Sequence, residues 1–156
     1  CVHTPLLVSL QGLQKSEKQF DENTEINTRI GSKMSKSIPE GCIFVHDTPE
    51  EIKAKMRAAF CPPKQAEGNP VMEIAKLTIF VEKTSLTISR SPKHGGPETF
   101  FSYKELEKAY TEGKLHPLDL KEGVADALTQ ILEPVREYFC KHPKNLERMK
   151  QIEISR

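Results

Sequence analysis

The chain has 156 residues, of which 37% are hydrophobic and 29% are charged, and its formal net charge is +1. This composition is typical of a soluble globular protein with one core, or with one small domain beside part of another. No apolar run has the length of a membrane span and no signal peptide is present, so we expect a cytoplasmic protein without a membrane partner. The four cysteines form no CxxC pair and have no zinc-site spacing, so we expect no metal centre.

The charge is distributed unevenly along the chain. Residues 29–37 hold three basic side chains and no acidic one, and residues 141–156 hold five Lys or Arg against two Glu. A local basic patch can bind phosphate even where the total charge is near zero. Both segments are therefore candidates for contact with a polyanion, although a solvated surface explains the second segment equally well.

The first part of the chain has the pattern of the end of an α/β unit. Residues 2–10 are predicted to form a buried strand, and residues 41–45 a second, shorter strand. Residues 14–37 are polar and too irregular for a helix or a strand, so we expect a long loop there. Because the chain starts at Cys1, within an apolar strand, we expect it to belong to a longer protein.

The remaining residues predict a mainly helical domain. Helices are expected to begin after Thr48, Asn69 and Ser102, which are residue types that cap helix N-termini. Thr48 and Ser102 are each followed three positions later by Glu, which is the pattern of a capping box. A Pro after Thr48 and after Asn69 favours the same starting points.

A small hairpin and a long helix complete this domain. Residues 85–90 and 98–102 alternate like paired strands, with a Gly- and Pro-rich loop between them. An apolar stripe over residues 120–139 predicts one long helix with a kink at Pro134. A basic tail helix is expected from Asn145.

The most specific string in the sequence is Lys33-Met34-Ser35-Lys36-Ser37. Two ammonium groups and two hydroxyls on a loop suit the phosphates of a nucleotide, whose oxygens gain charge during transfer. A loop that closes only after the nucleotide arrives applies its binding energy in the transition state. The alternative is a solvated Lys/Ser loop, and composition alone leaves both interpretations open.

This string is similar to the KMSKS signature of class I aminoacyl-tRNA synthetases. The segments around it resemble the archaeal/eukaryotic type of tyrosyl-tRNA synthetase, in the same order and over nearly the whole chain; they are HTPLL, CIFVHDTPEEIKAKMRAAFCPP, EGNPVMEIAK, SYKELEKAYTEGKLHPLDLK and ALTQILEPVR. The longer segments favour the tyrosine enzyme over its tryptophan relative. The resemblance implies that residues 1–47 are the C-terminal end of a Rossmann-type catalytic domain. It also implies that residues 48–156 are a mainly α-helical anticodon-binding domain with a small β-hairpin.

The implied activity is that of a tyrosine–tRNA ligase, which activates tyrosine with ATP and transfers it to tRNA(Tyr). The resemblance implies that Lys33 and Lys36 are catalytic and that Lys33, Met34, Ser35, Lys36 and Ser37 contact ATP, which enters with Mg²⁺ as a substrate. It implies no tightly bound cofactor, and a homodimer for the full-length enzyme. The HIGH signature and the tyrosine pocket of the family are not in this sequence, so we expect the chain alone to be inactive.

The resemblance also implies an anticodon site. A His-Pro-x-Asp motif places His116 and Asp119 at the first anticodon base, where the ring stacks and the carboxylate accepts from the base edge. His94, just before Gly95-Gly96, matches the residue that stacks on the other face of the base. The family usually has Phe at this position. The alternative for His116 and Asp119 is a loop residue and a helix cap.

Two further interpretations stay open at the level of the sequence. His3 and Thr4 lie near the end of a predicted core strand, where His3 is equally an ATP contact or a structural histidine. There are two alternatives to the enzyme: the chain is a stand-alone tRNA- or RNA-binding module without catalysis, or it is a nonfunctional remnant.

Overall fold

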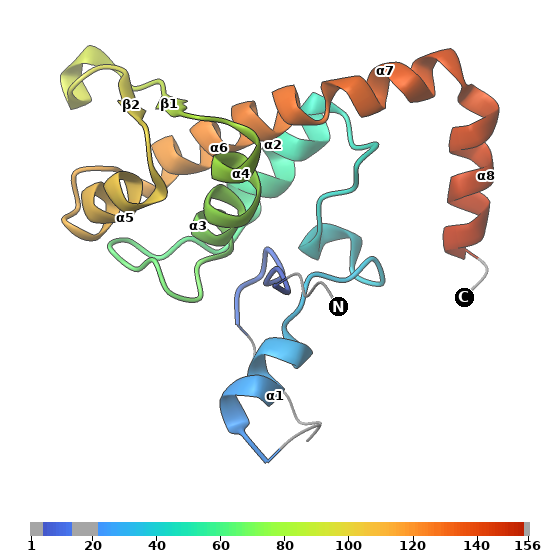
Figure 1. The fold of residues 1–156 in the computed structure, drawn as a ribbon, viewed down its shortest axis with the longest axis horizontal. Coiled ribbons are helices and arrows are strands. Elements are labelled where there is room, and N and C mark those ends of the chain that lie inside the picture. Colours follow the sequence, from blue (N-terminus) through green and yellow to red (C-terminus); the bar gives the residue numbers. More distant parts are fainter. Residues whose placement is uncertain (1–4, 14–21, 155–156) are drawn as a thin grey trace.

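The computed structural model describes residues 5–13 and 22–154, and these residues are mainly helical (Figure 1). The helices and strands are α1 (Thr24–Gly31), α2 (Pro49–Ala58), α3 (Pro70–Ile74), α4 (Phe80–Glu82), β1 (Leu86–Ile88), β2 (Glu98–Phe100), α5 (Tyr103–Thr111), α6 (Pro117–Ile131), α7 (Glu133–Lys141) and α8 (Pro143–Ile154). Short turns of other helix types are η1 (Pro39–Gly41), η2 (Ala75–Ile79) and η3 (Pro92–His94).

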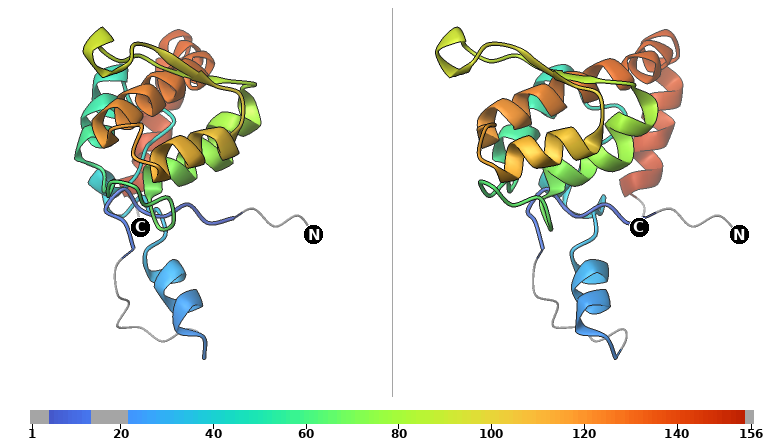
Figure 2. Two further views of the ribbon diagram at one scale, coloured as in Figure 1. Left: turned by 90° about the vertical axis from the view of Figure 1, so that its left-hand side faces the viewer. Right: turned by 60° about the vertical axis from the view of Figure 1, so that its left-hand side comes forward.

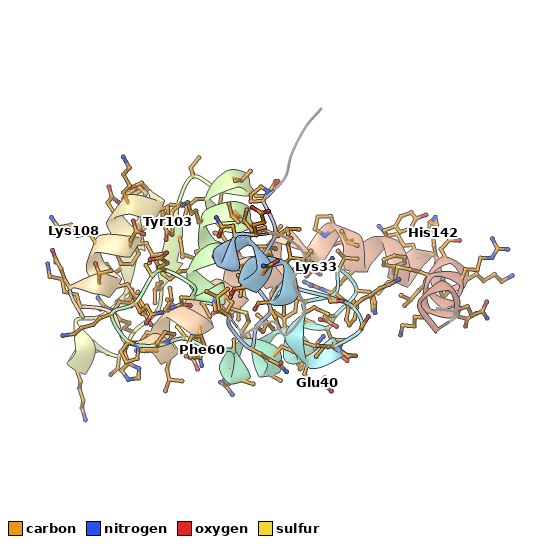
Figure 3. The ribbon with its side chains drawn as sticks, turned by 90° about the horizontal axis from the view of Figure 1, so that it is seen from below. Lys33, Glu40, Phe60, Tyr103, Lys108 and His142 are labelled. Carbon is orange, nitrogen blue, oxygen red and sulfur yellow. The ribbon has the colours of Figure 1, made fainter. Side chains whose placement is uncertain are left out.

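The helices α2 to α6 and the hairpin form one body from which the other elements extend. Helix α1 projects from one side of this body (Figure 1, Figure 2). Helix α7 leads away from the body, and α8 then points to the same side as α1 (Figure 1). Seen from below, Lys33 lies near the middle of the molecule, while Lys108 of α5 lies toward one end and His142 toward the other (Figure 3). No helix within residues 22–154 is both long enough and apolar enough to cross a membrane.

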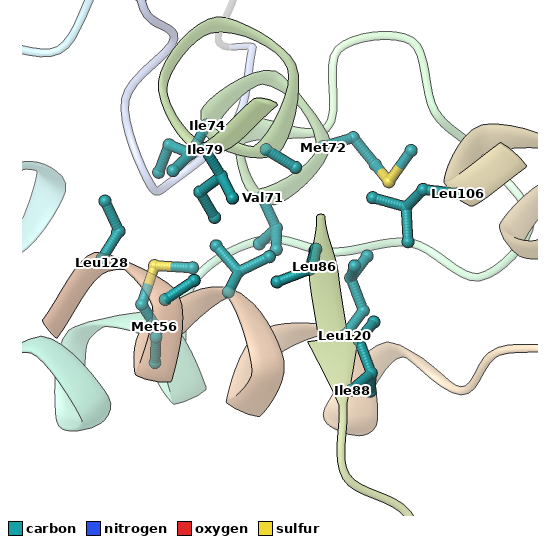
Figure 4. Packing of buried hydrophobic residues seen from close by; sticks show 14 of the residues in the cluster. Met56, Val71, Met72, Ile74, Ile79, Leu86, Ile88, Leu106, Leu120 and Leu128 are labelled. Carbon is teal, nitrogen blue, oxygen red and sulfur yellow. The ribbon is translucent and has the colours of Figure 1, made fainter. Parts of the chain in front are cut away.

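Helix α6 lies at the centre of the body. It packs against α2, β1, α3 and η2, and its residues Leu120 and Val124 are completely buried. Side chains from α2, α3, β1, α5 and α6 meet in one core (Figure 4). Position 123 is glycine because a Cβ atom there would lie only 2.8 Å from Ile88 Cγ1 of β1. The helix and the strand can therefore approach each other more closely than side chains would permit.

The three predicted helix starts are confirmed. The Thr48 hydroxyl accepts a hydrogen bond from Glu51 N–H, and the Glu51 carboxylate accepts one from Thr48 N–H, which completes the capping box. Asn69 accepts from the first turn of α3. The Ser102 hydroxyl accepts from Glu105 N–H, but the Glu105 carboxylate accepts from Phe101 N–H instead of Ser102 N–H. In the second predicted capping box, the Glu105 carboxylate therefore bonds the N–H one residue before the cap residue.

The hairpin is also confirmed, with shorter strands than predicted. Leu86 pairs with Phe100, Thr87 with Thr99 and Ile88 with Glu98 in an antiparallel register. Leu86 and Ile88 face the core, and the exposed Thr87 and Thr99 hydroxyls lie 2.9 Å apart. The alternation in residues 85–90 thus corresponds to a strand with one buried face.

The expected strands of the first part are not formed among the described residues. Residues 5–10 contribute only an isolated bridge between Val8 and Lys33, and residues 41–45 form no strand. A strand needs a regular ladder of backbone hydrogen bonds to one neighbouring strand. The described residues 7–10 instead make single backbone hydrogen bonds to separate segments at Ser32, Met34, Gly41 and Phe60. The part of the first strand at residues 2–4 lies outside the described residues.

The predicted loop over residues 14–37 contains a helix, so that prediction is wrong for α1. Asn23 caps the helix by accepting a hydrogen bond from Ile26 N–H through its side-chain oxygen. Ile26 and Ile30 follow at a spacing of four residues, and Gly31 ends the helix. Two apolar residues in a polar segment are a weak periodic signal, and the cap is the signal that indicates this helix.

The single kinked helix predicted over residues 120–139 is two helices. Helix α6 ends at Ile131, and Pro134 lies in the first turn of α7, where a missing N–H leaves no helical bond unmade. The Arg136 side chain donates to the Thr129 carbonyl and pairs with Glu133, which fixes the junction. The predicted tail helix from Asn145 begins two residues earlier, at Pro143.

Two leucines of α6 provide a test of this core. Leu120→Ala should reduce the free energy of unfolding by about 2–5 kcal/mol, because it removes buried methyl groups and leaves a cavity. Leu118→Ala makes the same chemical change at a side chain that is 53% exposed, so its effect should stay within about 0.5 kcal/mol. Urea unfolding followed by circular dichroism measures both, and equal losses would contradict this position of the core.

Candidate functional site

The KMSKS segment follows α1 and is anchored at its start. Met34 N–H donates to the Leu7 carbonyl at 2.7 Å, and Ser9 N–H donates to the Ser32 carbonyl at 2.8 Å. The Met34 side chain packs against the core. The first half of the motif is therefore held to residues 7–9 by backbone hydrogen bonds and by packing.

The second half of the motif is a turn at the surface. Ile38 N–H donates to the Ser35 carbonyl at 3.2 Å, and Ser37 N–H lies 3.4 Å from the Ser35 hydroxyl oxygen. Lys33 and Lys36 are both exposed. Neither ammonium group has an ion-pair partner among the described residues, so both are available for phosphate oxygens.

A separate pocket of about 540 Å³ lies at the N-terminus of α6, where it is lined by residues 63–64, Arg90 and residues 113–119. His116 and Asp119 both contribute to its wall, as the sequence predicts for two residues of one site. None of the residues 33–37 lines it. The structure therefore places the predicted nucleotide and anticodon residues at two different sites.

His116 is both the cap of α6 and an exposed ring at the pocket. Its Nδ1 accepts a hydrogen bond from Leu118 N–H at 3.2 Å, which satisfies one of the free N–H groups at the helix start. Since Nδ1 accepts, the proton of the neutral ring lies on Nε2. The helix-cap alternative holds for His116 rather than for Asp119, and it leaves the ring surface available to a ligand.

Asp119 lies in the first turn of α6 and is half-buried. Its negative charge is favourable there because the N-terminus of a helix carries a partial positive charge. Within the described part of the chain its carboxylate has no hydrogen-bond or ion-pair partner. The carboxylate is therefore free to accept hydrogen bonds from a molecule in the pocket.

Arg90 joins the two loops beside the pocket, and sequence reasoning missed it. Its guanidinium donates to the Gly96 carbonyl at 3.1 Å, to the Lys114 carbonyl at 2.9 Å and to the Glu98 carboxylate at 2.5 Å. The Arg90 side chain is only 8% exposed. It therefore fixes the hairpin against the turn that leads to His116. No local sequence pattern indicates this role, because two of the three acceptors are backbone carbonyls.

The remaining predicted site residues cannot be placed at either site. His94 ends η3 in the hairpin loop, followed by Gly95 and Gly96 with φ values of 95° and 74°. The side chain of His94 lies outside the described part of the structure, so its stacking stays a prediction. His3 and Thr4 are also outside the described residues. Among the described residues, no three His, Cys, Asp or Glu side chains form a group that would hold a metal ion.

Comparison with protein families matches residues 24–133 to the family described as tRNA synthetases class I (W and Y). This chain belongs to that family. A tyrosine–tRNA ligase of Thermococcus kodakarensis is 49% identical over 160 residues, which are 99% of this chain and 41% of that protein. A tyrosine–tRNA ligase of Pyrococcus furiosus is 45% identical over the same shares. The class I family predicted from the sequence, with archaeal relatives, is therefore confirmed.

Solved structures agree with this assignment to the class I family. The tyrosyl-tRNA synthetase of Pyrococcus horikoshii, complexed with L-tyrosine, has a TM-score of 0.79 and 45% identity, over 94% of this chain and 39% of that one. The tyrosyl-tRNA synthetase of Aeropyrum pernix has a TM-score of 0.74 and 38% identity, over 97% of this chain and 38% of that one. The chain thus spans about two fifths of the length of the class I synthetases it matches.

In this class I synthetase chain, the three hydrogen bonds of Arg90, here called the Arg90 clamp, can be compared with a surface ion pair. Arg90→Met should reduce the free energy of unfolding by about 1–3 kcal/mol, because it removes three hydrogen bonds from a guanidinium that is nearly buried. Arg57 pairs with Glu122 at the surface, with side chains that are 66% and 53% exposed. Arg57→Met should therefore change stability by less than about 1 kcal/mol. Denaturant unfolding compares the two, and an equal effect would contradict the clamp.

Proposed function

We propose that this chain serves a tyrosine–tRNA ligase, in which it supplies the KMSKS loop and the anticodon-binding site. The observation that carries the proposal is the pocket at α6, where the exposed His116 ring lies beside a half-buried Asp119 carboxylate without a partner. A ring that stacks and a carboxylate that accepts are the groups needed to read a guanine edge. The 45–49% identity with tyrosine–tRNA ligases over 99% of the chain supports the same function.

We assign the KMSKS site to the activation of tyrosine and the α6 pocket to the recognition of tRNA. Lys33 and Lys36 stabilise the pyrophosphate that leaves when tyrosine attacks the α-phosphate of ATP, and Met34, Ser35 and Ser37 complete the contact with the nucleotide. Their exposure and free ammonium groups support this role. The Mg²⁺ ion enters with ATP, and tyrosine and tRNA(Tyr) are the other substrates. His116, Asp119 and His94 read the first anticodon base.

The proposed division of the chain follows these roles. Residues 1–47 belong to the end of a Rossmann-type catalytic domain, and residues 48–156 form the anticodon-binding domain. The core supports this division, because apart from Leu10 its fully enclosed residues lie between 52 and 128. A homodimer of the full-length enzyme and a cytoplasmic location remain part of the proposal.

Binding to anticodon hairpins tests the α6 site. The chain should bind an RNA hairpin with the anticodon GUA more tightly than one with AUA. Asp119→Asn should remove about 1–3 kcal/mol of this discrimination, because the amide presents a donor where guanine needs an acceptor. Asp126→Asn is the matched control, since Asp126 lies on the same helix outside the pocket and pairs with Lys53. Fluorescence anisotropy measures all three proteins, and equal binding of both hairpins by the unmodified chain would refute the anticodon role.

ATP–pyrophosphate exchange tests the KMSKS segment in an intact tyrosine–tRNA ligase that carries this sequence. Lys36→Ala should lower kcat, because the transition state loses about 2.7–4 kcal/mol of stabilisation. The KM for tyrosine should stay nearly unchanged. Lys104→Ala removes the same charge from the surface of α5 and should leave kcat unchanged. An unaltered kcat in Lys36→Ala would exclude Lys36 as a transition-state contact. If the chain is instead a stand-alone RNA-binding module, the hairpin discrimination should be seen, and Lys36→Ala should not change the exchange rate.

A further inference from the structure

The turn before the second helix of the body contains a strained lysine. Gln65 N–H lies 3.4 Å from the Pro62 carbonyl, which closes a four-residue turn with Pro63 and Lys64 at its centre. Lys64 has φ +61°. In the described part of the chain, every other residue with a positive φ is a glycine. In turns with Pro at the second position and a positive φ at the third, glycine or asparagine is strongly preferred at that third position. Lysine is therefore an unfavourable residue for this backbone.

This turn is fixed by its surroundings. The Tyr110 hydroxyl donates to the Pro62 carbonyl at 2.8 Å, and burial raises the pKa of Tyr110, so the hydroxyl keeps its proton. Asn69 donates from its side-chain nitrogen to the Gln65 carbonyl at 3.0 Å. Lys64 is thus held from both sides of the turn, and the strain at its backbone persists because the rest of the structure enforces it.

The Lys64 side chain runs along the wall of the α6 pocket. A Cβ atom at position 113 would lie 2.5 Å from Lys64 Cε and 3.3 Å from Lys64 Nζ. Gly113, with φ +79°, therefore leaves the space through which the lysine stem passes. Lys64 and Asp119 both line the pocket.

The other cations of the pocket wall are already engaged. Arg90 donates to three internal acceptors, and Lys114 forms an ion pair with Glu112 at 2.6 Å. Lys64 has no hydrogen-bond or ion-pair partner among the described residues, and the same holds for Asp119. The pocket thus holds a cation and an anion that do not neutralise each other. A ligand that fits both carries hydrogen-bond donors for the carboxylate and a negative group for the ammonium.

We propose that Lys64 binds a backbone phosphate of the RNA whose base is read by His116 and Asp119. This inference rests on the proposed anticodon function and extends it to a residue that the sequence did not indicate. A nucleotide has both required groups, since the edge of a guanine donates and its phosphate is negative. Phosphate contacts fix the position of a nucleic acid without reading its sequence. Lys64 therefore contributes affinity, and His116 and Asp119 contribute selectivity.

The test compares Lys64→Gly with the unmodified chain, with GUA and AUA hairpins as ligands. Glycine adopts φ +61° without strain, so the variant should keep or raise Tm. Its affinity for both hairpins should fall by the same factor, on the order of 5- to 10-fold at low salt. The slope of log K against log salt is negative, and it should become shallower by about 0.7, the value for one phosphate contact on a single strand. The GUA/AUA ratio should be unchanged.

Three controls make the result unambiguous. Lys64→Asn also removes the charge and tolerates a positive φ, so it should reproduce the loss of affinity. Lys64→Arg should retain the affinity, and Lys104→Ala, on α5 outside the pocket, should retain both the affinity and the salt slope. If Lys64→Gly keeps its affinity as Lys104→Ala does, or if its salt slope is unchanged, the phosphate contact is overturned.

The two proposals fail in different ways. If the unmodified chain prefers GUA but Lys64→Gly binds as tightly, the role of Lys64 is wrong and the anticodon site stands. If the chain binds both hairpins equally and Lys64→Gly weakens both, the phosphate contact stands and base reading at this pocket is wrong. A chain that binds neither hairpin would refute both.

Discussion

The close approach of α6 to β1 is the constraint from which the candidate RNA site follows. Gly123 permits this approach, because any side chain there would meet Ile88. With α6 fixed against β1 on one side and α2 on the other, the start of α6 has one possible position in the body. His116 and Asp119 lie on that first turn, and Arg90 extends β1 to the same place. The wall of the pocket that α6 supplies is therefore positioned by the core.

The sequence predicted the parts of this fold that depend on local interactions. Thr48, Asn69 and Ser102 accept hydrogen bonds from residues two or three positions away, so their effect can be read from neighbouring letters. The expected strands at residues 2–10 and 41–45 depend on pairing with distant segments, which apolar composition does not report. Helix α1 was missed for the opposite reason, since a polar composition outweighed the cap at Asn23.

The same distinction applies to the candidate sites. The residues 33–37 and the pair His116 and Asp119 form short strings, so their motifs are visible without a structure. Arg90 and Lys64 act through the positions of Lys114, Gly96 and Gly113, which are up to about 50 residues away in the chain. In addition, the backbone strain at Lys64 is a property of a conformation, and no residue pattern reveals a lysine with a positive φ.

A short extended segment connects the KMSKS segment to the helical body. Residues 7–9 hydrogen-bond to the KMSKS segment through Met34 N–H and the Ser32 carbonyl, and Val8 N–H donates to the Glu73 carboxylate of α3 at 3.1 Å. Leu10 continues this link, because its carbonyl accepts from Phe60 N–H at 2.7 Å and its side chain is buried in the core. A movement of the start of the KMSKS segment must therefore carry residues 7–9 with it or break their hydrogen bonds. Among the described residues, the turn at Lys36 and Ser37 has no such bonds to this segment, so it is the part of the motif that can move without breaking them.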